Sequence, residues 1–132
     1  MNVLIIGGTR NVGFFLAVAM HAAGHRVTVL NRGITRDELP AEIERLHADR
    51  ADANALRRAL EGRTFDAVVD ATLYNADEAA VIVDLLRRRT GHYVFLSSGQ
   101  VYLVRDGLLR PFHERDYDGR LLPPPKPETY AY

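Results

Sequence analysis

An apolar strand that runs directly into a glycine-rich turn constrains this chain more than any other feature. Residues 3–6 are four consecutive apolar residues, three of them β-branched, as expected of a parallel strand buried on both faces. The turn that follows holds Gly7, Gly8 and Gly13, and residues 14–20 form an apolar run of helix length. Strand, tight glycine turn and helix are the context that a dinucleotide-binding fingerprint requires. The alternative is a turn that merely joins a strand to a helix.

Each glycine has a physical role in the nucleotide-binding interpretation. Gly7 permits the turn, Gly8 lets the backbone approach a pyrophosphate, and Gly13 lets the helix pack closely on the strand. The helix N-terminus offers free N–H groups and the positive end of the helix dipole to phosphate. The predicted cofactor-binding residues of this segment are Gly7, Gly8, Thr9, Arg10, Asn11, Val12 and Gly13.

Composition narrows the class of protein. The 132 residues, 47% of them hydrophobic, suffice for one domain with a core. Seventeen basic and 17 acidic residues give zero net charge, so no basic face for nucleic acid is indicated. No apolar run approaches the roughly 20 residues that span a bilayer, and we expect no signal peptide. Because cysteine is absent, disulfides and thiolate metal sites are excluded, and we predict no metal and a soluble cytoplasmic domain.

Strand and helix patterns alternate through residue 96. We expect strands over residues 3–6, 25–30, 43–48, 65–72 and 92–96, and helices over 12–23, 54–60 and 77–89. Asp52 is the predicted N-cap of the second helix, and Gly24, Gly62 and Gly91 are expected to end the three helices. This alternation predicts an α/β fold, a Rossmann-like doubly wound parallel sheet in three α/β/α layers with strand order 3-2-1-4-5.

The end of the second strand bears on the choice of cofactor. Where NAD is the cofactor, an Asp or Glu usually stands here and bonds the ribose 2′-hydroxyl. This chain has Asn31 followed by Arg32. A carboxylate would repel a 2′-phosphate, whereas a guanidinium can hold it, so NADP is favoured over NAD. The alternative is an ordinary solvated arginine.

Other residues are placed by the predicted sheet. Ligands bind beyond the carboxyl ends of parallel strands, which puts Ala71 and Thr72 beside the cofactor, while Tyr74 either lines the same cleft or caps the strand. Residues 87–89, all arginine, are expected at the end of the third helix, where they complement its dipole as a solvated helix end. The aromatic pair at 14–15 is expected to pack in the core.

Two motifs carry a resemblance to a known family. Gly7-Gly8-Thr9 with Gly13 follows a G-G-T-x-x-x-G pattern, with Arg10 where the G-x-x-G-x-x-G form has its middle glycine. Ser97-Ser98, followed by Val101-Tyr102, looks like an S-S-x-x-V-Y signature. Both resemble the extended short-chain dehydrogenase/reductase superfamily, in particular the NAD-dependent epimerases and dehydratases. Gly-Gly-Thr-Arg is similar to a subgroup related to chloroplast stem-loop RNA-binding proteins and isoflavone-reductase-like enzymes.

The resemblance implies roles for particular residues. It puts a catalytic hydroxyl on Ser98, which would hydrogen-bond the substrate oxygen whose charge changes during hydride transfer. It puts Asp49, just after the third strand, at the adenine amino group. The family's acid–base is a tyrosine followed four residues later by a lysine. This chain lacks such a pair, since its only lysine is Lys126; the candidates are Tyr130 and Tyr132, of which Tyr132 is the presumptive one.

The family usually continues with an active-site helix and a substrate-binding region that are absent here. We therefore interpret residues 1–132 as an N-terminal portion, with a core over 1–98 and a loop-rich segment over 99–132. The missing helix is expected to leave Val81, Leu85 or their neighbours exposed, which predicts a homo-oligomer.

Three functions follow from these patterns. The leading one is the NAD(P)-binding domain of an epimerase/dehydratase or reductase that acts on a nucleotide sugar or a similar small hydroxylated substrate. The second is a non-catalytic NADP-sensing regulator, which fits the missing lysine. The third is RNA binding, suggested only by the subgroup resemblance and opposed by the neutral charge.

Overall fold

The computed structural model describes residues 1–98, 106–107, 113 and 115. The chain divides into two compact units, Met1–Leu96 and Ser97–Tyr132. The helices and strands named below all lie in the first unit. Within the described ranges, no helix is both long and apolar enough to cross a membrane.

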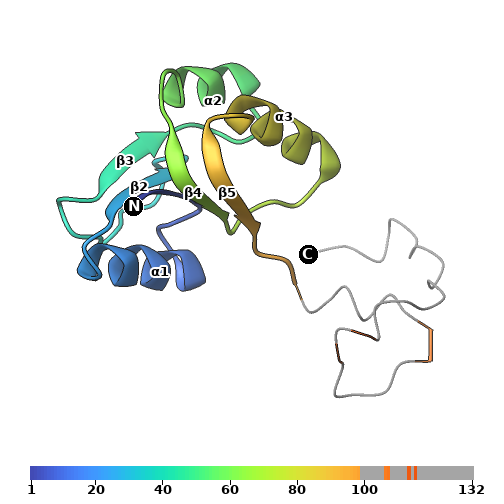
Figure 1. The fold of residues 1–132 in the computed structure, drawn as a ribbon, viewed down its shortest axis with the longest axis horizontal. Coiled ribbons are helices and arrows are strands. Elements are labelled where there is room, and N and C mark those ends of the chain that lie inside the picture. Colours follow the sequence, from blue (N-terminus) through green and yellow to red (C-terminus); the bar gives the residue numbers. More distant parts are fainter. Residues whose placement is uncertain (99–105, 108–112, 114, 116–132) are drawn as a thin grey trace. The chain divides into compact units, whose positions relative to one another are not determined.

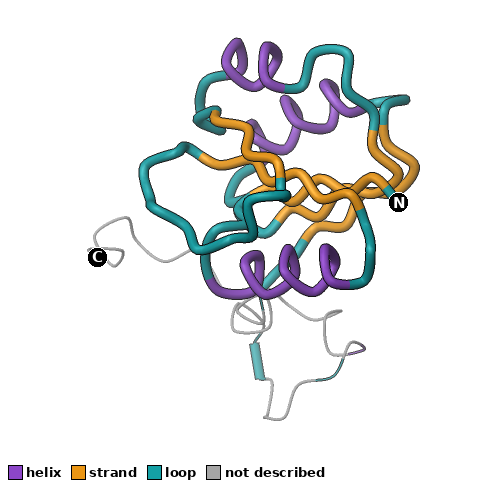
Figure 2. The backbone as a smooth tube through the Cα atoms, turned by 90° about the vertical axis from the view of Figure 1, so that its left-hand side faces the viewer, coloured by secondary structure: helices purple, strands orange, loops and turns teal. Residues whose placement is uncertain are grey.

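The first unit is a five-stranded parallel sheet with the order β3-β2-β1-β4-β5 (Figure 1). Helix α1 lies on one face of the sheet, and helices α2 and α3 lie on the other (Figure 2). The predicted fold and strand order are therefore confirmed. The elements in chain order are β1 (Asn2–Ile6), α1 (Asn11–Ala22), β2 (Arg26–Asn31), β3 (Glu44–His47), α2 (Ala53–Ala59), β4 (Phe65–Asp70), α3 (Ala76–Leu86) and β5 (Thr90–Phe95).

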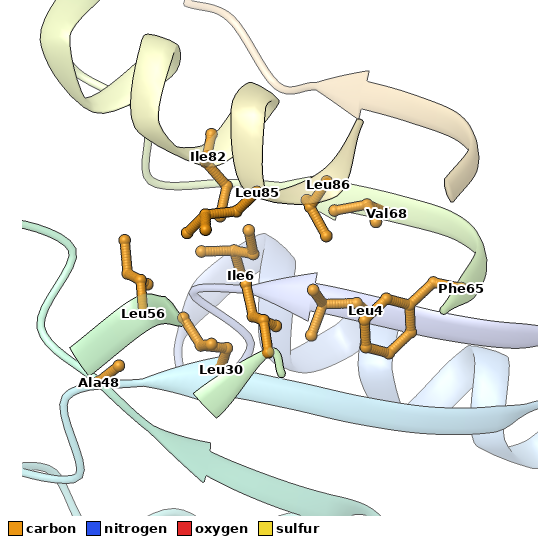
Figure 3. Packing of buried hydrophobic residues seen from close by; sticks show 11 residues of the cluster. Leu4, Ile6, Leu30, Ala48, Leu56, Phe65, Val68, Ile82, Leu85 and Leu86 are labelled. Atoms are coloured by element: carbon orange, nitrogen blue, oxygen red, sulfur yellow. The ribbon is translucent and has the colours of Figure 1, made fainter. Parts of the chain in front are cut away.

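The apolar run of β1 is explained by two cores, one on each face of the sheet. Leu4 and Ile6 belong to a core completed by α2 and α3, which Figure 3 shows with Leu56, Ile82, Leu85 and Leu86 around them. Val3 and Ile5 point to the opposite face and pack in a second core with Ala17 of α1. Successive strand residues face opposite sides, so a strand covered on both faces needs apolar residues at every position.

The predicted ends of α1 and α2 are close to those observed. The Asp52 side chain accepts hydrogen bonds from the backbone N–H groups of Asn54 and Ala55, which confirms it as the N-cap of α2. Gly24 follows α1 with a φ of +80°, and its N–H donates to the carbonyl of His21. Such a left-handed residue after a helix favours glycine, as the sequence indicated.

The predicted end of α3 was wrong. The helix ends at Leu86, so the arginines at 87–89 follow it instead of forming its last turn, and Arg88 has a φ of +61°. Gly91, expected to end the helix, lies inside β5. The reason is strand pairing: the Phe65 N–H donates to the Arg89 carbonyl at 2.8 Å, which aligns the chain with β4 from this point.

The aromatic pair in α1 also departs from expectation. Phe14 is partly buried against the core, but Phe15 is 72% exposed. The two rings meet edge to face with centroids 5.5 Å apart. Neighbouring helix residues differ by about 100° in direction, so only one of the pair can face the sheet.

Part of the α1 face carries no helix within the described chain. The sheet register sets Ala67 and Val69 beside Val3 and Ile5, and sets Val94 beside Val69. These side chains share the α1 face, yet Val94 is 39% exposed.

Exposure was predicted at Val81, Leu85 or their neighbours. Leu85 is buried and Val81 packs partly buried against the same core, so neither of these two is exposed, whereas their neighbour Val83 is 49% exposed. The uncovered surface is on the opposite face of the sheet, because α3 already covers its own face. Self-association stays a prediction, and a monodisperse monomer at high concentration in a sizing experiment would contradict it.

Candidate functional site

A cavity of 550 Å³ opens at the carboxyl ends of the first four strands. In an open parallel sheet this is where ligands bind, because the strand order reverses between β1 and β4. Its lining residues are Ile6, Gly7, Thr9, Arg10, Leu30, Asn31, Arg32, Gly33, Ile34, Thr35, Ala48, Asp49, Arg50, Thr72, Tyr74 and Glu78.

The glycine turn after β1 has the geometry that its sequence predicted at two positions. Gly7 has a φ of +85°, and a Cβ there would overlap the Thr72 side chain. A Cβ on Gly13 would overlap the Gly7 carbonyl oxygen and lie 3.0 Å from its carbon. Any side chain at either position would push the helix or the β4 loop away from the turn.

The other turn residues divide between the cavity and the sheet. Thr9 and Arg10 line the cavity, whereas Gly8 is buried and a Cβ there would lie 2.6 Å from Val29 Cγ1. Gly8 therefore lets the turn pack on the sheet, and the approach of its backbone to a pyrophosphate stays a prediction. Asn11 and Val12, the first residues of α1, are exposed and are not among the lining residues.

The N-terminus of α1 has no side-chain cap. Arg10 occupies the N-cap position, and its side chain makes no capping hydrogen bond. The first N–H groups of a helix have no intrahelical acceptor, so an anion in this turn would meet donors that no side chain has satisfied.

Two arginines line the end of the cavity next to β2. Arg32 follows β2 directly, and Arg10 reaches this loop, with its Nη2 donating to Thr35 Oγ1 at 3.1 Å. Asn31 Oδ1 accepts from the Gly33 N–H at 2.6 Å, which leaves Asn31 Nδ2 buried without a partner among the described residues. Guanidinium and amide N–H groups are donors only, a set suited to phosphate.

Asp49 lines the cavity beyond β3. Its Oδ1 accepts from the Ala51 N–H at 2.9 Å, and its backbone carbonyl accepts from the Asp52 N–H at 3.0 Å. These bonds make a tight turn that joins β3 to the N-cap of α2.

Beyond β4, a buried carboxylate organises the cavity wall. Asp70 is fully buried and accepts hydrogen bonds from Arg50 Nη2 and from the Tyr93 hydroxyl, the latter at 2.6 Å. Burial, together with the bond to Asp70, raises the pKa of Tyr93, so the phenol stays protonated and donates. Thr72 lines the cavity as predicted, whereas the N–H of Ala71, which is not a lining residue, donates to the Ile6 carbonyl.

The two predicted catalytic residues lie in the second unit. Ser98 is exposed and follows β5 by three residues. Tyr132 lies outside the described residues. The catalytic assignments of both stay predictions.

The structure thus brings seven predicted cofactor residues to one cavity: Gly7, Thr9, Arg10, Asn31, Arg32, Asp49 and Thr72. It also places there Arg50, Thr35 and Glu78, which sequence reasoning missed, and Tyr74, which it left open. A signal for Arg50 did exist. Asp70 follows the apolar run Ala67–Val69 in β4, and a buried carboxylate requires a cationic or hydrogen-bonding partner.

Comparisons with known proteins agree with this fold. A family model described as the NAD dependent epimerase/dehydratase family matches residues 3–132. The chain is 33% identical over 128 residues to the chloroplast stem-loop binding protein of 41 kDa b from Arabidopsis thaliana, covering 87% of this chain and 33% of that protein. It is 36% identical over 81 residues to 2'-dehydrokanamycin reductase from Streptomyces kanamyceticus, covering 61% and 23%.

Among solved structures, the chain is similar to the Bordetella bronchiseptica enzyme WbmG in complex with NAD and UDP. The TM-score is 0.71 at 16% identity, with 93% of this chain and 44% of that chain covered. This likeness shows the fold. The chain spans a third or less of the length of the two curated relatives.

Proposed function

Since the chain belongs to the NAD dependent epimerase/dehydratase family, we propose that it binds a nicotinamide dinucleotide in the cavity beyond β1–β4, with NADP preferred over NAD. The observation that carries this proposal is the shared cavity itself. The glycine turn at one end and two arginines at the other line a single space of 550 Å³.

The residues present fit the pyrophosphate of such a cofactor. Gly7 and Gly13 keep the turn free of side chains, and α1 begins without a side-chain cap. Backbone N–H groups at a helix N-terminus bind phosphate through hydrogen bonds and the helix dipole. When bound, the nicotinamide would supply hydride transfer.

The preference for NADP rests on the β2 end of the cavity. Arg32 and Arg10 both line it, and neither has an ion-pair partner among the described residues. The residue that ends β2 is Asn31 and not a carboxylate, so nothing at this position would repel a 2′-phosphate. The buried Nδ2 of Asn31 supplies a further donor without a partner.

Calorimetric titration with NADPH and, separately, NADH tests the proposal. We expect tighter binding of NADPH. The variant Arg32→Ala should weaken NADPH binding by roughly 10- to 100-fold, the value of a charge-assisted bond to phosphate, and leave NADH nearly unchanged.

Arg36→Ala is the matched control, because Arg36 is an exposed arginine of the same loop that does not line the cavity. Equal losses for both cofactors in Arg32→Ala would refute the 2′-phosphate role. Tighter binding of NADH by the unmodified chain would refute the preference for NADP.

We propose further that the whole protein is an epimerase/dehydratase or reductase acting on a nucleotide sugar or a similar hydroxylated substrate. Ser98 would donate a hydrogen bond to the reacting substrate oxygen, and Tyr132 would exchange its proton. In a chain extended to the length of its relatives, Ser98→Ala should lower turnover and Ser97→Ala should not. Binding of NADPH with no hydride transfer to any such substrate would favour the NADP-sensing regulator instead.

RNA binding is the second candidate. One relative is named as a stem-loop binding protein, and the arginines at 87–89 line a second cavity of 510 Å³ with Arg57 of α2. Glu61 and Asp84 line the same cavity and reduce its positive charge, which is why this candidate comes second. Stem-loop RNA titrated at increasing salt decides it, since phosphate-driven binding weakens steeply with salt.

A further inference from the structure

Asp70 is the one ionisable side chain that is fully buried among the described residues. A carboxylate removed from water is costly unless it is paired and hydrogen-bonded. Here the partners come from three other places in the chain: Arg50 beyond β3, Tyr93 in β5, and the Thr72 backbone, whose N–H donates to Asp70 Oδ1 at 3.1 Å. Through Arg50 and Tyr93, Asp70 therefore ties together segments that meet only in the folded sheet, while its bond to the Thr72 amide shapes the turn directly after β4.

The groups that Asp70 holds are parts of the cavity wall. Arg50 and Thr72 line the cavity, whereas Asp70 and Tyr93 do not and lie behind it. A Cβ on Gly7 would overlap the Thr72 side chain, so Thr72 packs directly against the glycine turn. Because Asp70 holds Thr72, and Thr72 packs against the turn, Asp70 helps to set the position of the turn that is proposed to hold the pyrophosphate.

Arg50 extends the same network to the first turn of α3. Its side chain is 12% exposed, and its Nε lies 3.9 Å from Glu78 Oε2. Arg50 Nε and Nη1 and Glu78 Oε2 are buried with no hydrogen-bond partner among the described residues. The bond from Nη2 to Asp70 and the ion pair with Glu78 thus hold this guanidinium, and Arg50 follows Asp49 in the loop beyond β3.

Stability alone gives a weak reason for this arrangement. A buried ion pair costs desolvation that its Coulomb attraction only partly offsets, and apolar replacements of such pairs are often neutral or stabilising. Position is the stronger reason, since the network joins three lining residues from different segments: Arg50 beyond β3, Thr72 beyond β4, and Glu78 in the first turn of α3.

We infer that Asp70 is a positioning residue for the adenosine half of the dinucleotide site, acting through Arg50 and the Thr72 amide. The inference rests on the proposed function, because it assumes that the cavity binds a dinucleotide. Asp70 touches no part of the ligand itself. It fixes the loops beyond β3 and β4 at the separation that the nucleotide requires.

The test uses the double variant Arg50→Gln/Asp70→Asn, which removes both charges and leaves neither one buried alone. Glu44→Gln/Arg63→Gln is the matched control, because this pair, joined at 2.7 Å, does not line the cavity: Glu44 begins β3, and Arg63 lies just before β4. Both variants are titrated with NADPH and with 2′,5′-ADP, which carries only the adenosine half. Hydrogen exchange of residues 48–52 and 71–75 is followed without ligand.

The expected result is a loss of about tenfold or more for both ligands in Arg50→Gln/Asp70→Asn, of equal size for NADPH and 2′,5′-ADP, with faster exchange in both loops. The control should keep its affinities and the exchange of these loops. Unchanged affinity in the test variant, or equal losses in test and control, would overturn the inference.

Failure of the proposed function has a different signature: the unmodified chain would bind neither ligand. The exchange data separate the two cases, because the loops are compared without any nucleotide. Should Arg50→Gln/Asp70→Asn not fold, Asp70→Asn alone supplies the test. Asp70 accepts hydrogen bonds on both carboxylate oxygens, whereas an asparagine amide has only one acceptor oxygen and cannot hold both Arg50 and the Thr72 N–H. Wild-type affinity in Asp70→Asn would then overturn the inference.

Discussion

Replacing Gly13 by alanine tests how the glycine turn and α1 depend on each other. Gly13 is the third residue of α1, where helix propensity alone predicts that alanine stabilises by up to about 1 kcal/mol. The packing predicts the opposite sign. A Cβ at this position would overlap the Gly7 carbonyl oxygen and lie 3.0 Å from Gly7 C and 3.1 Å from Gly8 Cα.

The magnitude follows from these contacts. Carbon atoms in ordinary contact are about 3.5–4.0 Å apart, so α1 must move by roughly 0.5–1 Å. All three obstructing atoms are backbone and cannot rotate away. Overpacking of this kind costs about 1–3 kcal/mol, which leaves a net loss of up to about 2 kcal/mol after the full gain in propensity. For a unit of this size the midpoint of thermal unfolding should fall by about 4–8 °C per kcal/mol.

Thermal unfolding and NADPH titration measure the two consequences together. Because the helix N-terminus moves away from the turn, NADPH affinity should fall by roughly tenfold or more. Gly24→Ala is the matched control. Alanine at the Gly24 φ of +80° is strained by about 1 kcal/mol, but nothing lies within 4 Å of the added Cβ. It should lose stability and keep its affinity. A Gly13→Ala variant that is more stable than the unmodified chain, with unchanged affinity, would refute the reasoning.

Three further predictions follow from individual contacts. Asp52→Ala should lower the free energy of unfolding by about 1 kcal/mol in denaturant titration, because it removes the N-cap of α2; no change would contradict the capping role. The Arg45 guanidinium holds the pKa of the Asp37 carboxyl below its ordinary value of 3.8, so the pair stabilises above that pH and loses its effect as the pH falls through the lower folded value. Asp37→Asn, which leaves the Arg45 bonds to three backbone carbonyls in place, should therefore cost up to about 1 kcal/mol at pH 7 and less below pH 4, and a deficit that grew in acid would contradict this sign. Phe14→Ala should lower the midpoint of thermal unfolding more than Phe15→Ala, since only the Phe14 ring packs on the core. Equal midpoints in the two variants would contradict this difference in packing.

The sequence by itself determined the fold and the location of the site. Four apolar residues before a glycine turn specify a strand buried on both faces, and regular alternation with helices leaves a doubly wound sheet as the consistent arrangement. Gly13 could be assigned in advance because its constraint is local: a Cβ there would meet only backbone of Gly7 and Gly8. The positive φ of Gly7 is likewise a local property of the turn, although the Thr72 side chain that packs against Gly7 comes from a distant strand end. The same holds for Asp52, whose capping bonds reach only two and three residues along the chain.

Only the tertiary structure decided those features that depend on contacts between residues far apart in the chain. The end of α3 and the place of Gly91 in β5 were set by pairing with β4, against the local helix pattern. Which ring of the pair at 14–15 faces the sheet depends on the rotation of α1, which neighbouring residues do not fix. The bond between Arg50 and Asp70 joins residues 20 positions apart. Such pairs form because folding brings the ends of parallel strands to one edge, and a buried charge there must find whatever partner the neighbouring loops present.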